Sequence, residues 1–396
     1  MYRRACLLTL LLQSLICPVH AHDPSAWGGL YRSRDDGASW LPVDAGLFVS
    51  GAVSVAISPT DPNHLLYSTD SRLLRSGNGG RDWKPEGEGV VGAPALVAAF
   101  DRDGTGAIAS SAGGIYWTAD GKRWQDSNAP TGAAPARAIA AGATPGRFYL
   151  AGSRSLFVSD DSGHRWTRAG DALPEGAITT LLVLAAPQER VFAIAAGEPW
   201  VTRDGAGTWR PAGVGLPRGR VETLAADAPP GTRLWAAGGA QVYSSDDDGA
   251  TWRAVGRPLP EPDTSVRGIA AASDGQVIVL TTHRGMVRSR DGGKTWGAVE
   301  GALPTHLEAG PLIRDPHDRA TLYAGFALTP YSEIWRRADE GYSLLSQIDP
   351  VSLAGGAAFL LLLVILGVLA ARRLSAAYAG HDARAPVHRH PKETAR

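Results

Sequence analysis

The sequence predicts an all-β fold, a seven-bladed β-propeller at residues 22–347 with a C-terminal transmembrane helix behind it. Three observations predict this architecture. A tryptophan-containing motif recurs seven times between residues 33 and 296. Glycine (48 residues) and proline (27 residues) are abundant and only 20% of the residues are charged, which is typical of a turn-rich β protein. Residues 351–371 contain no charged side chain at all.

Residues 1–21 have the three parts of a secretory signal peptide. Arg3 and Arg4 supply the positive start, residues 6–17 form an apolar run, and Ala21 offers a small residue for cleavage. We therefore expect the mature chain to be exported and to begin after Ala21. An uncleaved anchor is the main alternative.

The two cysteines of the chain, Cys6 and Cys17, both lie inside this signal segment. A lipoprotein signal ending at Cys17 is disfavoured, because Ile16 is too bulky for that processing site. The mature protein then has no thiol, which excludes disulfides and cysteine catalysis.

The repeated motif reads Ser-x-Asp-x-Gly-x-Thr-Trp. Successive tryptophans are separated by 43, 41, 42, 43, 43 and 44 residues, which indicates one structural unit of about 42 residues. The residues that mark the motif are Asp35, Trp40, Trp83, Asp120, Trp124, Asp161, Trp166, Asp204, Trp209, Asp247, Trp252, Asp291 and Trp296.

Each motif has a structural reason. The aspartate and the Ser/Thr hydroxyls can hydrogen-bond nearby backbone groups and close a turn. The glycine permits a positive φ, and the tryptophan buries a large surface against a neighbouring strand. We therefore interpret these aspartates as turn staples rather than as catalytic acids.

Between two motifs the sequence provides three further short apolar strands, for example residues 137–141, 148–151 and 267–271. Four strands per repeat, repeated seven times, match the blades of a propeller. A hairpin at residues 29–44 stands alone at the N-terminal end. The ring can close by pairing this hairpin with the last unit, which leaves 334–344 as an extra segment. Alternatively, the hairpin is an addition to seven complete blades, or the ring has eight.

Residues 351–371 are apolar enough and long enough to cross a bilayer as a helix. Arg372 and Arg373 follow at once, so the positive-inside rule places the basic tail at residues 372–396 in the cytoplasm. We expect a single-pass protein with its propeller on the extracytoplasmic side, the periplasmic side of a bacterial inner membrane. A C-terminal sorting tag is the alternative, but the long tail departs from that pattern.

The formal net charge of zero hides an uneven distribution. Residues 22–371 contain 31 basic and 37 acidic residues, a net charge of about −6. A mildly acidic domain gives no support to nucleic-acid binding, which depends on a basic surface.

The motifs resemble the Asp-box repeat, also called the BNR repeat. That family includes sialidases, sortilin-type receptor ectodomains and propellers that assist photosystem II assembly. The even spacing and the x-Ile-Ala-x-x-Pro strands resemble the photosystem II assembly and stability factor type most closely. The resemblance implies a non-enzymatic propeller that holds or chaperones a membrane protein.

An enzymatic role is the strongest rival. A sialidase-like glycoside hydrolase needs three arginines, a tyrosine nucleophile with a glutamate partner, and an aspartic acid, and no such set can be assigned here. The Arg-Ile-Pro segment that normally precedes the first box in sialidases has no counterpart. A nucleophile elbow, a zinc-protease motif and a phosphate loop are also missing from the sequence. We expect neither catalysis, nor a cofactor, nor a metal site.

The innermost strand of each blade begins at the channel mouth opposite the Asp-box turns. Aligning these strands on Ile139, Leu224 and Ile269 places Arg137, Glu222 and Arg267 in one register, with Arg220 close by. These four charged residues are the predicted partner-binding site, and they suit a partner that carries carboxylates. The sequence thus favours a protein-binding or assembly scaffold with a membrane-embedded protein partner. A carbohydrate-binding or hydrolysing propeller is the alternative, and a receptor-like sorting role ranks below both.

Overall fold

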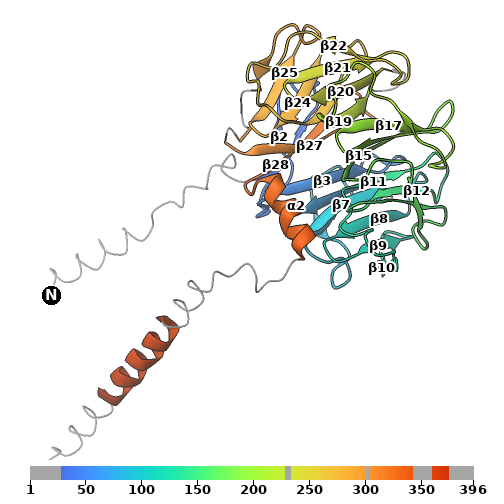
Figure 1. The fold of residues 1–396 in the computed structure, drawn as a ribbon. Helices are drawn as coiled ribbons and strands as arrows, with labels where there is room; N and C mark the ends of the chain where they lie inside the picture. The colour runs from blue at the N-terminus through green and yellow to red at the C-terminus, as the bar shows by residue number, and fades with distance from the viewer. Residues whose placement is uncertain are drawn as a thin grey trace, which may run out of the picture. The chain divides into compact units, whose positions relative to one another are not determined.

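A computed structural model describes residues 28–227, 233–299, 301, 303–304, 306–341 and 359–373. The predicted signal peptide, residues 351–358 of the predicted span and residues 374–396 of the predicted tail lie outside these ranges. Residues 28–341 belong to one compact unit and residues 359–373 to another. The first unit consists of seven four-stranded sheets (Figure 1). The predicted seven-bladed β-propeller is therefore confirmed.

Each blade runs outward through four antiparallel strands. The innermost strands are β3 (Ala52–Ile57), β7 (Ala95–Phe100), β11 (Ala138–Ala141), β15 (Ile178–Leu184), β19 (Val221–Ala226), β23 (Val266–Ala271) and β27 (Glu308–Arg314). The second strands are β4 (Leu65–Thr69), β8 (Ala107–Ser111), β12 (Phe148–Ala151), β16 (Arg190–Ala195), β20 (Leu234–Gly238), β24 (Ile278–Thr282) and β28 (Leu322–Ala327). The third strands are β5 (Leu73–Ser76), β9 (Ile115–Thr118), β13 (Leu156–Ser159), β17 (Glu198–Thr202), β21 (Gln241–Ser245), β25 (Gly285–Ser289) and β1 (Gly29–Ser33). The outermost strands are β6 (Lys84–Pro85), β10 (Gln125–Asp126), β14 (Thr167–Ala169), β18 (Arg210–Pro211), β22 (Arg253–Val255), β26 (Gly297–Ala298) and β2 (Leu41–Pro42).

Burial changes steeply from the inside to the outside of a blade. Every residue of β4, β8, β20, β24 and β28 is buried, because both faces of a second strand pack against neighbouring blades. These strands are accordingly rich in apolar residues, and β4, β8 and β24 each end in two buried Ser or Thr residues. The outermost strands β6, β10, β18 and β26 are exposed. The hydrophobic core therefore lies between blades, in a ring around the channel.

The last blade is shared between the two ends of the domain. Strand β1 pairs antiparallel with β28, with Gly29 opposite Phe326 and Ser33 opposite Leu322, and β2 pairs with β1. Its sheet order is β2-β1-β28-β27. The N-terminal hairpin thus completes the seventh blade, as the first of the predicted alternatives requires. The eight-bladed alternative is wrong for the ring that the described residues form.

The repeated motifs form the turns between third and fourth strands. In the turn that contains Asp247, the Ser245 hydroxyl donates to the Asp247 carboxylate (2.7 Å) and accepts from the Gly249 amide (2.9 Å). The Thr251 amide also donates to this carboxylate, at 2.8 Å. The Trp252 indole then donates to the Ala212 carbonyl of the preceding blade at 2.7 Å. This turn is closed internally, and its tryptophan ties it to a neighbouring blade. The indoles of Trp83, Trp124, Trp166 and Trp296 also reach the preceding blade, whereas Trp40 donates to Gly37 of its own turn.

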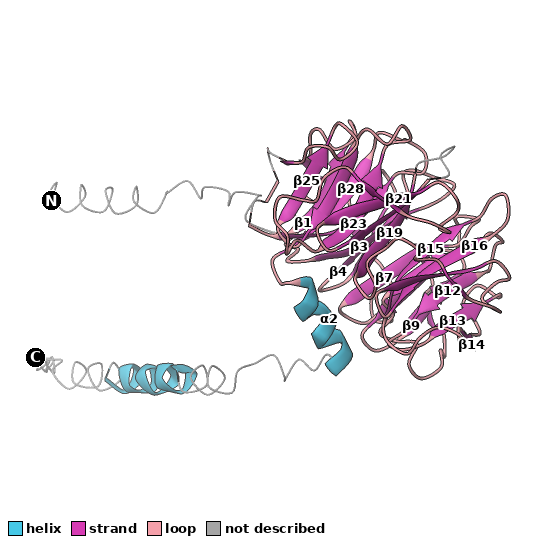
Figure 2. Ribbon diagram, turned by 45° about the horizontal axis from the view of Figure 1, so that its top comes forward, coloured by secondary structure: helices cyan, strands magenta, loops and turns pink. Residues whose placement is uncertain are grey.

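One helix follows the last blade. Helix α2 (Tyr331–Glu340) covers most of the segment that the sequence left as an extra after ring closure. It lies beside the starts of β3 and β7 in both views (Figures 1 and 2). Its buried residues are Tyr331, Ile334 and Ala338.

Residues 359–373, which include part of the predicted membrane span, are also helical. Within the described ranges, no helix combines the length and the apolar character that crossing a membrane requires.

Candidate functional site

The channel has two mouths. The innermost strands begin at one end, where Val53 and Leu96 pack against α2; we call this end the helix-side mouth. They finish at the other end, where Arg314 donates to Asp36 of the first Asp-box turn at 2.7 Å; we call this end the turn-side mouth. The four residues of the predicted partner-binding site all lie at strand starts, and thus at the helix-side mouth.

Arg267, the second residue of β23, belongs to the contact with the beginning of α2. Its guanidinium donates to the Glu308 carboxylate at 2.6 Å and lies over the Tyr331 ring, 4.9 Å from the ring centroid. The same Glu308 oxygen accepts from the Tyr331 amide at 2.9 Å. Burial opposes the ionisation of Glu308, but the hydrogen bonds from Arg267 and Tyr331 outweigh it and lower the pKa of this carboxyl. The carboxylate is thus charged at neutral pH and fixes the first residue of the helix.

Arg137, directly before β11, holds the other end of the helix. Its guanidinium forms an ion pair with Asp339 and lies over the Trp335 ring, 4.5 Å from the ring centroid. The side chain of Arg137 is only 20% exposed, and its Nε is buried without a hydrogen-bond partner. The two arginines predicted from the sequence therefore bind a segment of their own chain, one near each end of α2.

Apolar packing joins these two polar contacts. Tyr331, Ile334 and Ala338 form one cluster with Val53, Leu96 and Ala327. The Tyr331 hydroxyl donates to the Ala52 carbonyl at 2.6 Å, and burial raises the pKa of this phenol well above its ordinary value. A tyrosine that is buried, protonated and donating to a backbone carbonyl is a packing residue rather than a nucleophile.

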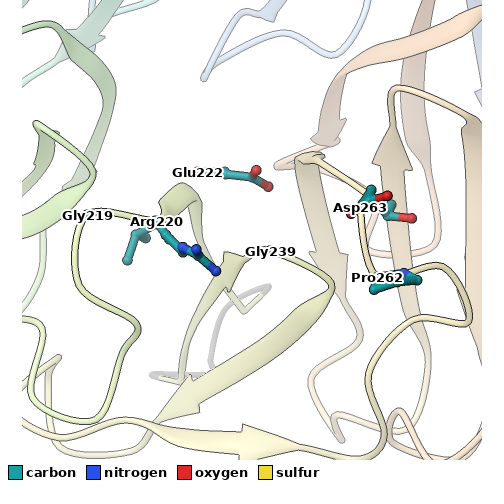
Figure 3. Close-up of a pocket in the computed structure, with 8 residues that line it drawn as sticks. Gly219, Arg220, Glu222, Gly239, Pro262 and Asp263 are labelled. Atoms are coloured by element: carbon teal, nitrogen blue, oxygen red, sulfur yellow. The ribbon is translucent and has the colours of Figure 1, made fainter.

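Arg220 and Glu222 lie elsewhere on the same mouth. They line a cleft of about 380 Å³ and face Pro262 and Asp263 across it (Figure 3). Glu222 accepts from the Val266 amide at 2.7 Å, and burial raises its pKa. Arg220 is exposed. The structure therefore separates the four predicted residues into a pair that contacts α2 and a pair beside an open cleft.

The turn-side mouth contains a different cavity. A cleft of about 570 Å³ is lined mainly by aliphatic side chains near the ends of β15, β19, β23 and β27. Arg314, Asp315 and His317 contribute its polar wall. Arg314 is held by Asp36, and His317 by a 2.9 Å contact of its ring Nε2 with the Ser58 carbonyl.

A tyrosine–glutamate pair with an arginine does exist, but it lies away from the channel-facing strands. The Tyr149 hydroxyl donates to Glu189 at 2.5 Å, and Arg147 donates to the same hydroxyl at 2.9 Å. Tyr149 is 0% exposed, and burial raises its pKa strongly. A fully buried phenol with a raised pKa is a poor nucleophile. The group joins two blades through β12 and the β15–β16 turn.

The aspartates of the Asp-box turns are also unsuited to acid catalysis. Hydrogen bonds from the threonine four residues on lower the pKa of Asp204, Asp247 and Asp291 to about 2. They are therefore ionised at neutral pH and act as hydrogen-bond acceptors. In the ranges that the structure describes, no group of three or more His, Cys, Asp or Glu side chains could hold a metal ion.

Sequence reasoning missed four residues of the helix contact: Glu308, Tyr331, Trp335 and Asp339. Glu308 escaped the strand alignment because it is the first residue of β27, whereas Glu222 and Arg267 are the second residues of β19 and β23. The helix residues carried a usable signal, since Tyr331, Ile334, Trp335 and Ala338 recur with the spacing of one helix face.

Comparison with known proteins shows the fold. No protein-family model and no curated protein matches the chain. Among solved structures, YCF48 bound to D1 peptide is 17% identical with a TM-score of 0.52, and the match covers 71% of this chain and 95% of that one. YCF48 from Cyanidioschyzon merolae is 15% identical with a TM-score of 0.53, covering 71% and 97% of the two chains. The GH74 xyloglucanase from Xanthomonas campestris is 19% identical with a TM-score of 0.51, covering 70% and 53%. At these identities the likeness establishes a β-propeller and leaves the activity open.

Proposed function

We propose that this chain is a membrane-anchored extracytoplasmic propeller that serves as a non-catalytic protein-binding or assembly scaffold. One observation carries the proposal. The helix-side mouth already holds a peptide segment, through two arginines and an apolar seat between them. A surface that binds one segment of polypeptide has the chemistry to bind another. A likeness to a propeller solved with a bound peptide supports the same reading.

The chemistry of the mouth favours a protein ligand over a sugar. Arg137 and Arg267 each combine an ion pair with a cation–π contact, a combination that suits carboxylate and aromatic side chains. The carbohydrate-binding or sialidase-like alternative requires a Tyr–Glu pair with converging arginines in the channel mouth. The pair that fits by composition, Tyr149 and Glu189, is buried between blades.

The location of the scaffold rests on the sequence. The apolar run 351–371 is the proposed anchor, and the signal at residues 1–21 is the proposed export signal. The linker between the end of α2 and the anchor is short. A short linker gives the helix-side mouth a high effective concentration of membrane-embedded partners. The Asp-box resemblance, closest to the photosystem II assembly-factor type, is consistent with such a role.

The test is a crosslinked pull-down from native membranes. We expect wild type to capture a discrete membrane protein and the double variant Arg137→Glu, Arg267→Glu to lose it. Arg168→Glu, Arg253→Glu is the matched control, because both side chains are exposed on outer strands. Capture that survives in the first variant would place the binding surface elsewhere. If wild type captures no protein, the scaffold proposal is wrong and the propeller should be tested against glycans.

A further inference from the structure

Helix α2 contacts the mouth through three side chains at intervals of four residues. Tyr331 lies under Arg267, Trp335 lies under Arg137, and Asp339 pairs with Arg137. Residues i, i+4 and i+8 share one side of a helix and span about 12 Å along its axis. The same three positions in an extended strand would span about 26 Å. The distance between the two arginine contacts is therefore matched to a helical ligand.

The arginine contacts, the apolar packing of Tyr331, Ile334 and Ala338, and the hydrogen bond from Tyr331 to the Ala52 carbonyl hold the helix in place. The cap position, Pro330, makes no side-chain capping hydrogen bond, and isolated helices of ten residues are marginal in water. Its outer side carries local ion pairs, Glu333 with Arg336 and Arg337, and Arg336 with Glu340. The order of α2 thus depends on the mouth that it covers.

The contact with α2 also leaves a buried hydrogen-bond donor of the mouth without an acceptor. Arg137 Nε is buried under α2 without a hydrogen-bond partner. A buried unpaired donor on a charged group costs free energy that a better ligand would recover. A carboxylate that engaged both Nε and Nη2 of Arg137 would bind this arginine more tightly than Asp339 does.

From these contacts we infer that α2 is a resident ligand of the helix-side mouth, and that the protein partner displaces it with a helix of the same chemistry. The partner segment carries two aromatic side chains and a carboxylate at successive four-residue intervals. This inference rests on the proposed function, because it names the kind of partner that the scaffold binds. In the free protein α2 occupies the mouth, so only the molecules in which α2 has left the mouth can bind the partner. The apparent affinity for the partner falls in proportion to that open fraction.

Gly310 provides a way to unseat α2 without touching either arginine. A Cβ at this position would lie 2.1 Å from Cζ of Tyr331, so Gly310→Ala should expel the tyrosine from its seat. Gly297→Ala is the matched control, because a Cβ there meets nothing within 4 Å. The double variant Trp335→Ala, Asp339→Arg releases the helix from its own side and leaves the mouth intact.

Release of α2 from the mouth is measured by the rate of trypsin cleavage after Arg336 and Arg337. Proteases cleave an ordered helix through its open form, so cleavage should be at least about tenfold faster in both releasing variants than in wild type or Gly297→Ala. Near-ultraviolet circular dichroism of the same samples checks that the blades remain folded. If neither variant accelerates cleavage while the blades stay folded, α2 is a fixed part of the propeller and the inference is wrong.

Binding is measured with a fluorescein-labelled synthetic peptide of residues 328–341 and the full chain in detergent. Gly310→Ala cannot serve as the receptor here, because its added Cβ also blocks the seat of the peptide's own Tyr331. We expect the peptide to bind the Trp335→Ala, Asp339→Arg variant, whose mouth is intact, at least about tenfold more tightly than wild type or Gly297→Ala. A peptide with Asp339→Lys should lose this binding. Equal affinity for wild type and the Trp335→Ala, Asp339→Arg variant, or failure to bind that variant once its α2 is shown to be released, overturns the inference.

The pull-down separates this inference from the proposed function. Peptide binding to the released mouth with no captured membrane protein supports the resident ligand and refutes the scaffold. A partner captured equally by wild type and by the Trp335→Ala, Asp339→Arg variant, and not displaced by the peptide, supports the scaffold and refutes displacement.

Discussion

The helix-side and turn-side mouths are made from opposite ends of the same seven strands, yet they have different chemistry. At the helix-side mouth, Arg137 and Arg267 lie over two aromatic rings of a single helix, and Arg137 also forms an ion pair with it. At the turn-side mouth, Arg314 is fixed by Asp36 within the ring, beside an open cleft of about 570 Å³. Arginine thus contacts a segment outside the blades at one end and is held within its own blade at the other. Arginine content alone does not locate a binding surface, and the partner of each guanidinium decides its role.

The largest expected difference between the two mouths is in stability, and it concerns the tryptophan of a repeated turn. Trp252 is 4% exposed and donates to Ala212 of the preceding blade. Trp252→Ala should lower the free energy of unfolding by about 3–5 kcal/mol, because it removes a large buried side chain and leaves a cavity. Denaturant unfolding measures this loss. Trypsin cleavage of α2 at low denaturant should stay at the wild-type rate, and an increase would show that the two mouths are coupled.

The second contrast is in pH dependence, because carboxyl groups toward the two mouths titrate in opposite directions. Asp44 lies where the N-terminal hairpin meets the first blade, and it accepts from the Leu30 amide (2.9 Å) and the Tyr67 hydroxyl (3.0 Å). Burial raises its pKa from 3.8 to about 6. The protonated form is favoured in the folded state, so the associated stability is present below pH 3.8 and is lost as the pH rises through about 6. The loss amounts to about 3 kcal/mol.

Asp44→Asn is the variant that tests this. Both hydrogen bonds end on one oxygen, which the amide retains, while the titrating group is removed. The variant should abolish the fall in unfolding free energy between pH 4 and 6.5 that wild type shows. The turn-side carboxyl groups behave in the opposite way, because hydrogen bonds lower the pKa of Asp204, Asp247 and Asp291 to about 2. Their contribution to the free energy of unfolding is lost only as the pH falls from 3.8 toward 2. An unchanged slope in Asp44→Asn would mean that another group controls the fall.

The smallest effect is expected at the helix itself. Tyr331→Phe removes the hydrogen bond to the Ala52 carbonyl and keeps the ring under Arg267. It should weaken the seating of α2 by about 1 kcal/mol, and so raise trypsin cleavage after Arg336 and Arg337 about fivefold. The melting temperature of the blades should stay within experimental error of wild type. A large drop in melting temperature would instead make α2 part of the blade core.

The two mouths also differ in how well the sequence predicts them. The Asp-box turns are local: Ser245, Asp247 and Thr251 lie within seven residues, so spacing alone identifies the hydrogen bonds that close the turn. Strand alignment likewise brings Arg137, Glu222 and Arg267 to one mouth, because each innermost strand repeats the same short pattern. The contacts of α2 are not local. Arg137 and Asp339 are 202 residues apart in the chain, and no periodic pattern connects them.

Ring closure was ambiguous for the same reason. The pairing of Gly29 with Phe326 joins the two ends of the domain, and a local motif is compatible with either closure or an added hairpin. Glu308 was missed for a simpler reason, since it is the first residue of β27, whereas Glu222 and Arg267 are the second residues of their strands. Long-range pairing is the main physical source of what the sequence did not reveal.

The shared seventh blade has a consequence for how the protein is made. Its outer strands β1 and β2 are synthesised first, and the strand that β1 pairs with, β28, is among the last parts of the domain to follow. While the intervening six blades are being translated, β1 keeps an unpaired edge, which other strands can pair with. The ring can close only when residues 322–327 have been synthesised, shortly before the proposed anchor. Completion of the fold and synthesis of the proposed anchor are therefore nearly simultaneous events in the life of each molecule.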